Sequence, residues 1–428
     1  MIRLAIKNIF HKPLTLALSV SLFALGAGLI TVLLLLNKQL GDQFERNLAG
    51  IELVIGAKGS PLQMILCNMY HIDAPTGNIS IGEVKPFLNP KHPLIRQAVP
   101  LSLGDNYKGY RIVGTTPGFL TLYTSTFQQG RIWQEDFEVV AGAGVADELG
   151  LKIGDTFFSV HGFADDDDMV HDYTPPFRIV GILEPNGSVL DQLLLCNSAT
   201  VWKVHAHGDE LETVEPPVLE ATPQDYSEEQ LLEWHAEAID ELVTKDNLDI
   251  TSVLVKFRGR NYQTLNMMRN INEQTNLQAA NPAIEINRLY LLLGVGIEAL
   301  QALAILIMIV SGLSVFISML NALKQRKYEL ALMRVMGASK AKLLILILLE
   351  GVLIAVVGYA AGALIGHTAV GVLSGFMQDA YKYALDPFVY LSQEFILLFA
   401  CVGIGMLAAL LPAIQAYKTD IASTLTQK

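Results

Sequence analysis

Charged residues are scarce in this 428-residue sequence, at 17%, whereas hydrophobic residues make up 51% and the mean hydropathy is +0.38. This balance excludes a disordered chain and is too apolar for an ordinary soluble protein. The net charge is −12 and no basic tract is present, which argues against a nucleic-acid partner. Three cysteines are too few for a disulfide framework. The composition therefore predicts a membrane protein that carries a soluble part.

Sequence motifs of enzymes are also missing. The chain has no Gly-x-x-x-x-Gly-Lys-Ser/Thr loop for nucleotide phosphates, no Gly-x-Ser-x-Gly and no His-Glu-x-x-His. We therefore expect no catalytic residue and no enzymatic activity in this chain. Within the apolar runs, ionisable side chains are limited to Glu350 and His367, whereas a proton-coupled carrier normally has more of them along its path.

Four long apolar runs are present, at residues 14–36, 299–323, 343–377 and 395–416. With a rise of about 1.5 Å per residue, the first run is about 35 Å long, which is enough to cross a bilayer core. It is too long for the apolar part of a signal peptide and no small-x-small cleavage site follows it, so we expect it to stay uncleaved. The third run exceeds one crossing and either extends past the membrane or bends at Gly358 or Gly362. These runs predict four transmembrane helices, one before and three after a large domain.

Lysine and arginine in the short flanks predict the orientation. They are concentrated in residues 1–13, in the loop 324–342 and in the tail 417–428, whereas the loop 378–394 has only Lys382. By the positive-inside rule, both termini and the loop 324–342 are cytoplasmic. The chain is then a multi-pass protein of the bacterial inner membrane with residues 37–298 in the periplasm.

The first thirteen residues alternate apolar and polar side chains before Pro13. This pattern favours a short amphipathic helix on the inner leaflet, and the alternative is a simple extension of the first transmembrane helix.

Residues 37–298 mix strand-like and helix-like segments, which predicts an α+β domain. They contain 18 basic and 36 acidic residues, whereas the rest of the chain contains 12 basic and 6 acidic residues. The expected strands are residues 51–55, 110–113, 138–141, 156–160, 177–183, 192–195 and 251–257. The expected helices are residues 145–149, 228–244 and 262–278.

Most of this negative charge lies in one segment, residues 161–241, which has 19 acidic and two basic residues and five of the nine histidines. Imidazoles close to carboxylates suit zinc or another borderline divalent ion. A solvated acidic loop is the alternative, because acidic runs are usually just solvated. The candidate ligands, in two clusters, are His161, Asp165, Asp168 and His171, and His205, His207 and Asp209.

Two smaller features of the domain have alternative interpretations. The apolar stretch 62–72 between glycines and prolines is either a helix packed in the core, which we favour, or a hydrophobic flap near the membrane. Cys67 and Cys196 are both in the domain, and Cys401 is in the last apolar run. We expect all three to be free, buried thiols.

The loop 324–342 has apolar and charged residues at helical spacing, followed by Gly337-Ala-Ser339. A short amphipathic helix between two spans is a natural docking element for a cytoplasmic partner, and an ordinary basic loop is the alternative. Glu329-Leu-Ala-Leu-Met-Arg-Val-Met-Gly-Ala-Ser339, followed by an apolar helix with Glu350-Gly351, resembles the signature of FtsX-like permeases. These are the ABC transporter subunits that include MacB, LolC, LolE and FtsX.

The domain carries the same resemblance. Gly130-Arg131, the segment from Val145 to Thr156 and Phe177-Arg-Ile-Val-Gly-Ile-Leu183 are similar to the MacB periplasmic core. The similarity extends over essentially the whole chain and includes its one-plus-three layout. MacB itself carries a fused N-terminal ATPase, whereas this chain starts directly at the first span, so we expect its layout to be closer to that of LolC and LolE.

The resemblance implies an inner-membrane dimer, formed with a second permease copy or a paralogue, and a separate cytoplasmic ABC ATPase dimer that binds ATP and magnesium. The domain is then divided into a membrane-proximal subdomain, residues 38–128 and 250–298, and an inserted acidic subdomain, residues 129–249. In this family the loop helix contacts the ATPase. The resemblance therefore assigns contact with the ATPase to Glu329, Leu330, Met333, Arg334, Gly337, Ala338 and Ser339.

The leading functional prediction is a mechanotransmitting permease that exports or extracts an amphiphile such as a lipoprotein, lipid, peptide or drug, with a periplasmic or outer-membrane partner and membrane lipid around it. Two alternatives remain. One is an FtsX-like regulator of a periplasmic hydrolase, and the other is a zinc-linked ABC system that uses the His- and Asp-rich segment.

Overall fold

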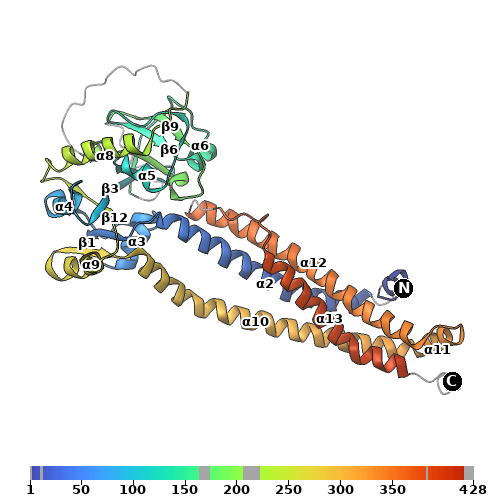
Figure 1. Ribbon diagram of the computed structural model, residues 1–428. Coiled ribbons are helices and arrows are strands. Elements are labelled where there is room, and N and C mark those ends of the chain that lie inside the picture. Colours follow the sequence, from blue (N-terminus) through green and yellow to red (C-terminus); the bar gives the residue numbers. More distant parts are fainter. Residues whose placement is uncertain (1, 10–12, 163–173, 206–221, 382–383, 419–428) are drawn as a thin grey trace. The chain divides into compact units, whose positions relative to one another are not determined.

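The computed structural model describes residues 2–9, 13–162, 174–205, 222–381 and 384–418, and its elements follow one another as Figure 1 shows. The chain divides into two compact units, which are described separately. The helical unit consists of Met1–Leu40 and Leu292–Lys428, and the α/β domain consists of Gly41–Leu291.

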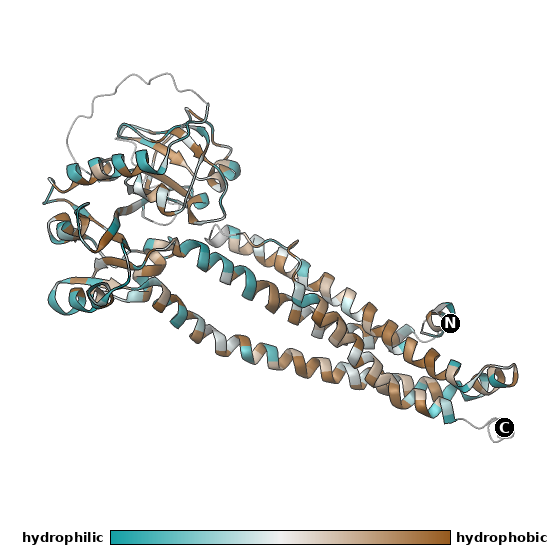
Figure 2. Ribbon diagram, in the orientation of Figure 1, coloured by the Kyte–Doolittle hydropathy of each residue, from teal (hydrophilic) through white to brown (hydrophobic). Residues whose placement is uncertain are grey.

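Among the described residues, four helices are long and apolar enough to cross a membrane. Figure 2 shows hydrophobic residues along most of their length. One of the four precedes the α/β domain and three follow it, which confirms the predicted one-plus-three arrangement. The four are α2 (Pro13–Leu48), α10 (Pro282–Gln325), α12 (Lys340–Tyr381) and α13 (Ser392–Lys418). Two shorter helices, α1 (Ile2–Ile9) and α11 (Lys327–Val335), accompany them.

Glycines let three of these helices approach closely. A Cβ atom added to Gly362 of α12 would lie 2.7 Å from the Cβ of Ala27 in α2, and one added to Gly351 would lie 2.6 Å from the carbonyl oxygen of Gly405 in α13. Lipid is as apolar as leucine, so membrane helices associate through such close packing rather than through the hydrophobic effect. Helix α12 continues through both Gly358 and Gly362 as one element, so these glycines serve helix contact.

The α/β domain contains a mixed sheet with strand order β13-β1-β12-β3-β4-β10-β6-β9-β5, to which β7 and β8 are added through β9 and β3. A separate pair joins β11 to β2. The strands are β1 (Leu53–Ala57), β2 (Ile79–Ser80), β3 (Ile95–Tyr107), β4 (Tyr110–Thr115), β5 (Phe127–Gly130), β6 (Glu138–Ala141), β7 (Thr156–Phe157), β8 (Val160–His161), β9 (Phe177–Leu183), β10 (Leu193–Asn197), β11 (Asp249–Ile250), β12 (Ser252–Phe257) and β13 (Leu277–Ala280).

The central strand β3 joins the two halves of this sheet. Its first part pairs with β12, from Ile95 to Leu101, and its second part pairs with β4, from Ser102 to Tyr107. The domain's helices are α3 (Pro61–Met69), α4 (Ile81–Leu88), α5 (Gly118–Leu122), α6 (Ala143–Leu149), α7 (Ser198–His205), α8 (Glu228–Leu242) and α9 (Tyr262–Gln274), with a 3₁₀ turn η2 (Val189–Gln192).

Both faces of the sheet are buried around β4, β6, β9 and β10. Successive residues of one strand belong to different hydrophobic clusters: Val139 and Ile179 pack on one face, and Val140 and Val180 pack on the other. Strands covered on both faces read as continuous apolar runs, which is why these segments were recognisable in the sequence.

The ends of α2 and α10 are part of the domain core. Phe44 of α2 contacts the rings of Tyr70 and Tyr290 at centroid distances of 5.2 and 5.3 Å. The backbone N–H of Val189 donates to the side-chain oxygen of Asn47 at 2.8 Å. The last residues of α2 and the first residues of α10 therefore belong to the core of the α/β domain.

The structure confirms an α+β domain but corrects several predicted elements. The expected strand 156–160 is two short strands, β7 and β8, and the expected helix 262–278 ends at Gln274 before β13 begins. The stretch 62–72 contains helix α3 with Met64, Ile65 and Cys67 buried, so the interpretation as a helix in the core is confirmed and the alternative of a hydrophobic flap is wrong. Cys67, Cys196 and Cys401 are free and buried, as predicted. The strand β3 was not predicted.

Candidate functional site

Helix α11 is delimited by its sequence. After it ends, the N–H of Ala338 donates to the carbonyl of Met333 and the N–H of Gly337 donates to that of Arg334. With Gly337 at φ +94°, this is the Schellman ending that favours glycine. The side chain of Ser339 then accepts a hydrogen bond from the N–H of Lys342, in the first turn of α12. Three residues predicted to contact an ATPase, Gly337, Ala338 and Ser339, thus form the turn between two helices.

One face of α11 packs on the helical unit. Leu330 and Ala331 are buried, and Met333 packs against the same hydrophobic cluster. Arg334 is partly buried, and its Nη1 has no hydrogen-bond partner among the described residues. The predicted residues Leu330 and Met333 therefore face inward.

The opposite face of α11 is apolar and exposed. Its side chains are between 44% and 71% exposed and recur at positions i, i+4, i+7 and i+8, which places them on one stripe of the helix. An exposed apolar stripe on a short helix fits a partner's groove. These residues were missed in the sequence because burial cannot be assigned from spacing alone; they are Tyr328, Leu332, Val335 and Met336.

Beneath α11, the buried carboxylate of Glu350 joins three segments of the helical unit. Its Oε1 accepts a hydrogen bond from Asn8 Nδ2 of α1 at 2.7 Å and lies 3.4 Å from Arg326 Nη1, at the junction of α10 and α11. Arg326 also pairs with Glu329 of α11, at 3.3 Å from Nε to Oε2. Glu350 was predicted from the sequence as an intramembrane polar residue, whereas Asn8 and Arg326 were not singled out.

A second cluster lies in the α/β domain, where β8 pairs with the end of β3 and Asp105 lies opposite His161. His205, the last residue of α7, completes the group. The three ligand atoms lie close together: His161 Nδ1 is 3.1 Å from His205 Nε2, and both are 3.4 Å from Asp105 Oδ1. The hydrogen bond to Asp105 raises the pKa of His205, although burial opposes this.

The structure brings together two of the seven predicted metal ligands, His161 and His205. The other five lie outside the described residues; they are Asp165, Asp168, His171, His207 and Asp209. Asp105 was missed because it is 56 positions from His161 and belongs to the unpredicted strand β3.

Profiles of two protein families match this chain. The FtsX-like permease C-terminal family matches residues 302–421, and the MacB-like periplasmic core domain matches residues 16–215. Together the two matches cover most of the sequence and both of its units.

The chain is an FtsX/MacB-type permease. Such permeases work with a cytoplasmic ABC ATPase, and the family together with the four apolar helices makes this a multi-pass protein of the bacterial inner membrane.

The permease is also similar to a solved structure, the periplasmic region of MacB from Actinobacillus actinomycetemcomitans. The sequence identity is 13% and the TM-score is 0.32, and the match covers 57% of this chain and 94% of that chain. A search of curated proteins found no match.

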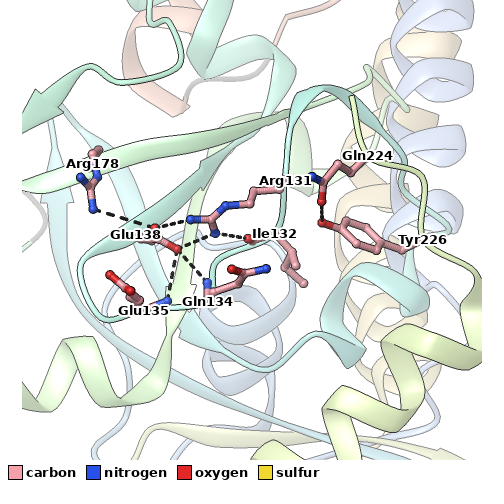
Figure 3. A network of polar contacts seen from close by, with 8 residues as sticks. All are labelled: Arg131, Ile132, Gln134, Glu135, Glu138, Arg178, Gln224 and Tyr226. Atoms are coloured by element: carbon pink, nitrogen blue, oxygen red, sulfur yellow. Dashed lines mark hydrogen bonds and ion pairs between the residues drawn. The ribbon is translucent and has the colours of Figure 1, made fainter. Parts of the chain in front are cut away.

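The Gly130-Arg131 motif of the permease forms a buried ion pair (Figure 3). Arg131 holds the fully buried Glu138 with two hydrogen bonds of 2.6 and 2.8 Å, and the backbone N–H groups of Gln134 and Glu135 also donate to this carboxylate. Burial alone would raise the pKa of Glu138, but Arg131 and the two N–H groups hold it below its usual value.

Gly130 supports this pair through its backbone. Its φ is +72°, and a Cβ atom there would lie 2.1 Å from the carbonyl oxygen of Val180. Only glycine fits such a close approach. The motif is therefore a structural element of the domain, and it explains why glycine and arginine occur together.

Proposed function

We propose that this chain is the membrane subunit of a MacB/LolE-like ABC transporter that converts ATP hydrolysis on a separate cytoplasmic ATPase into movement of the α/β domain in the periplasm. Through that movement it exports or extracts an amphiphile such as a lipoprotein, lipid, peptide or drug. The exposed apolar stripe of α11 carries this proposal, because it offers a docking surface on the loop for which the positive-inside rule gives a cytoplasmic position.

The connection from α11 to the rest of the helical unit supports the coupling role. Glu329 on α11 pairs with Arg326, which contacts Glu350 on α12, and Glu350 also holds Asn8 of α1. Coupling travels through such contiguous packed and hydrogen-bonded elements. A displacement of α11 by the ATPase would therefore act on three other helices.

The C-terminal end of α2 and the N-terminal end of α10 offer a route by which this movement would reach the α/β domain. Phe44 of α2 and Tyr290 of α10 are packed together in the domain core. A movement of either helix would therefore act on the residues packed around Phe44 and Tyr290. We assign the signal path to α2 and α10 for this reason.

The helical unit also leaves apolar surface for its membrane partners. On α10, residues four positions apart are each more than half exposed: Ile305, Ile309, Leu313 and Ile317. A second permease copy, or a paralogue, would pack on this stripe within the lipid, and small adjustments between the two copies would accompany the ATPase cycle.

The experiment replaces Leu332 and Met336, one at a time, with glutamate and measures how much ABC ATPase co-purifies with the detergent-extracted chain. Each buried apolar anchor contributes about 1.5–3 kcal/mol, and 1.4 kcal/mol corresponds to a factor of about ten. We expect the recovered ATPase to fall about tenfold or more, and Glu329→Ala to reduce it by a smaller factor.

The matched control is Leu265→Glu, at an exposed leucine of α9 in the α/β domain. It should leave ATPase recovery unchanged. Membrane insertion should be unaffected in all variants. Equal recovery of the ATPase with the α11 variants and with Leu265→Glu would contradict the proposed docking surface.

A further inference from the structure

We propose that Asp105, His161 and His205 form a binding site for a single zinc ion, or a similar borderline divalent ion, on the α/β domain. The proposal is independent of the coupling function above, because it rests on a different unit of the chain. Its evidence is the geometry of three ligand atoms, the groups that orient them and the chemistry of the set.

The spacing of the ligand atoms fits tetrahedral coordination. Four ligands at about 2.0–2.1 Å from zinc lie about 3.3–3.4 Å from one another at the corners of a tetrahedron. The distances among Asp105 Oδ1, His161 Nδ1 and His205 Nε2 are 3.4, 3.4 and 3.1 Å. The three atoms therefore form one face of such a tetrahedron, and among the described residues they are the only ligand atoms grouped in this way.

The orientation of His205 matches that of a metal ligand. Its Nδ1 donates to the carbonyl oxygen of Val201 at 2.8 Å, so in the neutral ring the lone pair is on Nε2, the atom that faces His161 and Asp105. A hydrogen bond from the other ring nitrogen to a carbonyl is the usual outer support of a histidine that binds metal. Three electron-pair donors this close to one another need a cation, or a shared proton, between them.

The other two ligands are supported by neighbouring side chains. Asp105 is 2% exposed, and its second oxygen accepts a hydrogen bond from Ser159 at 3.4 Å. Asn106, which is fully buried, donates to the carbonyl oxygens of Val160 and Gly162 on both sides of His161. The positions of Asp105 and His161 are therefore fixed by the pairing of β3 and β8.

The donor set selects the class of ion. Two imidazoles and one carboxylate suit zinc, whereas magnesium and calcium prefer oxygen ligands alone. An ion here would join the end of α7 and the strand β8 to the central strand β3. Zinc would then stabilise this part of the domain.

The test uses the full chain, purified in detergent with a tag free of histidine and stripped of metal with a chelator. Zinc binding is measured by equilibrium dialysis for the wild type and for His161→Ala, His205→Ala and Asp105→Asn. Both histidines are partly exposed, at 53% and 35% of the side chain, so their replacement should leave the fold intact. We expect each variant to lose affinity by more than the about 10–100-fold typical of a lost outer-shell partner.

His92→Ala is the matched control. His92 lies just before β3 begins, whereas Asp105 lies near the other end of this 13-residue strand, about 33 Å away at the rise of an extended chain. It should bind zinc like the wild type. Unchanged zinc affinity in the His161→Ala and His205→Ala variants, or no zinc uptake by the wild type, would overturn the proposal.

Cobalt provides a second measurement that does not depend on affinity. Cobalt in the wild-type site should give the intense visible bands of tetrahedral coordination, and these bands should disappear in His205→Ala. An octahedral spectrum would overturn the assignment. The midpoint temperature of thermal unfolding, followed by tryptophan fluorescence, should rise with zinc in the wild type and in His92→Ala. It should stay constant in the other variants, because an ion that binds only the folded state stabilises it.

Discussion

Two buried carboxylates, one in each unit, are held in opposite ways. Glu138 of the α/β domain is satisfied by its immediate neighbours, Arg131 and the backbone of Gln134 and Glu135. Glu350 of the helical unit is held by Asn8, which is 342 positions away in the sequence, and by Arg326 at the junction of α10 and α11. The first arrangement fixes one local piece of the fold, whereas the second links separate helices. A link of the second kind suits elements that have to move together.

The largest expected effect is on the local pair. Arg131→Ala should destabilise the α/β domain by about 3–5 kcal/mol, because it removes the two short hydrogen bonds to a buried carboxylate and leaves it the more distant Arg178, at 3.9 Å. All three tryptophans, Trp133, Trp202 and Trp234, are in this domain, so denaturant unfolding of the full chain can be followed by tryptophan fluorescence.

Arg269→Ala is the control for this experiment, because Arg269 pairs with Glu273 at the surface, where solvent screens such a pair and its contribution to stability is small. Acidic pH provides a second check. The folded-state pKa of Glu138 is depressed, so its contribution is present above the unfolded pKa and is lost as the pH falls through the folded value. Glu138→Gln should remove this acid-dependent loss. Similar stability of both arginine variants would show that the pair does not secure the domain.

An intermediate effect on stability is expected at the apolar contact between α12 and α2. Gly362→Leu should weaken the contact between α12 and α2 by about 1–3 kcal/mol, because a Cβ atom there overlaps Ala27. Circular dichroism during an SDS titration of the detergent-solubilised chain would measure the loss of helical packing.

Gly375→Leu is the matched control on the same helix, since a Cβ atom at Gly375 meets nothing within 4 Å. It should leave the SDS midpoint unchanged. If both leucine variants behave alike, the close approach of α12 and α2 is unimportant for the stability of the helical unit.

The smallest effect on stability is expected for the long-range link. Glu350→Gln should lower the stability of the helical unit by less than about 1.5 kcal/mol. The amide oxygen still accepts the hydrogen bond from Asn8, and Arg326 keeps its ion pair with Glu329. Its effect should instead appear in coupling, as weaker stimulation of the co-purifying ATPase by the permease.

Asn8→Ala tests whether the link acts as one unit. If it does, the Asn8→Ala and Glu350→Gln variants should lose stimulation to a similar extent, and the double variant should lose little more than either single one. Additive losses, or full stimulation in Glu350→Gln, would remove the distinction between the local and the long-range carboxylate.

The sequence by itself determined the membrane layout, the α+β class and the family. Long apolar runs predict membrane-spanning helices, and strands buried on both faces have sequences that are short apolar runs, such as Phe177–Leu183. The ending of α11 was also local information, since Gly337 and Ser339 form the turn through their own backbone and side chain.

Which residues come together in the functional clusters was decided only by the tertiary structure. Strand β3 was not predicted because its sequence does not alternate between apolar and polar residues: Asp105 and Asn106 are polar and yet buried. The exposed stripe of α11 depends on which face packs against other helices, and periodicity does not specify that. Asp105, His161 and His205 come from two strands and a helix end. Asn8, Arg326 and Glu350 come from α1, from the junction of α10 and α11, and from α12. Sequence spacing carries no information about such contacts, because they form only when distant segments pack together.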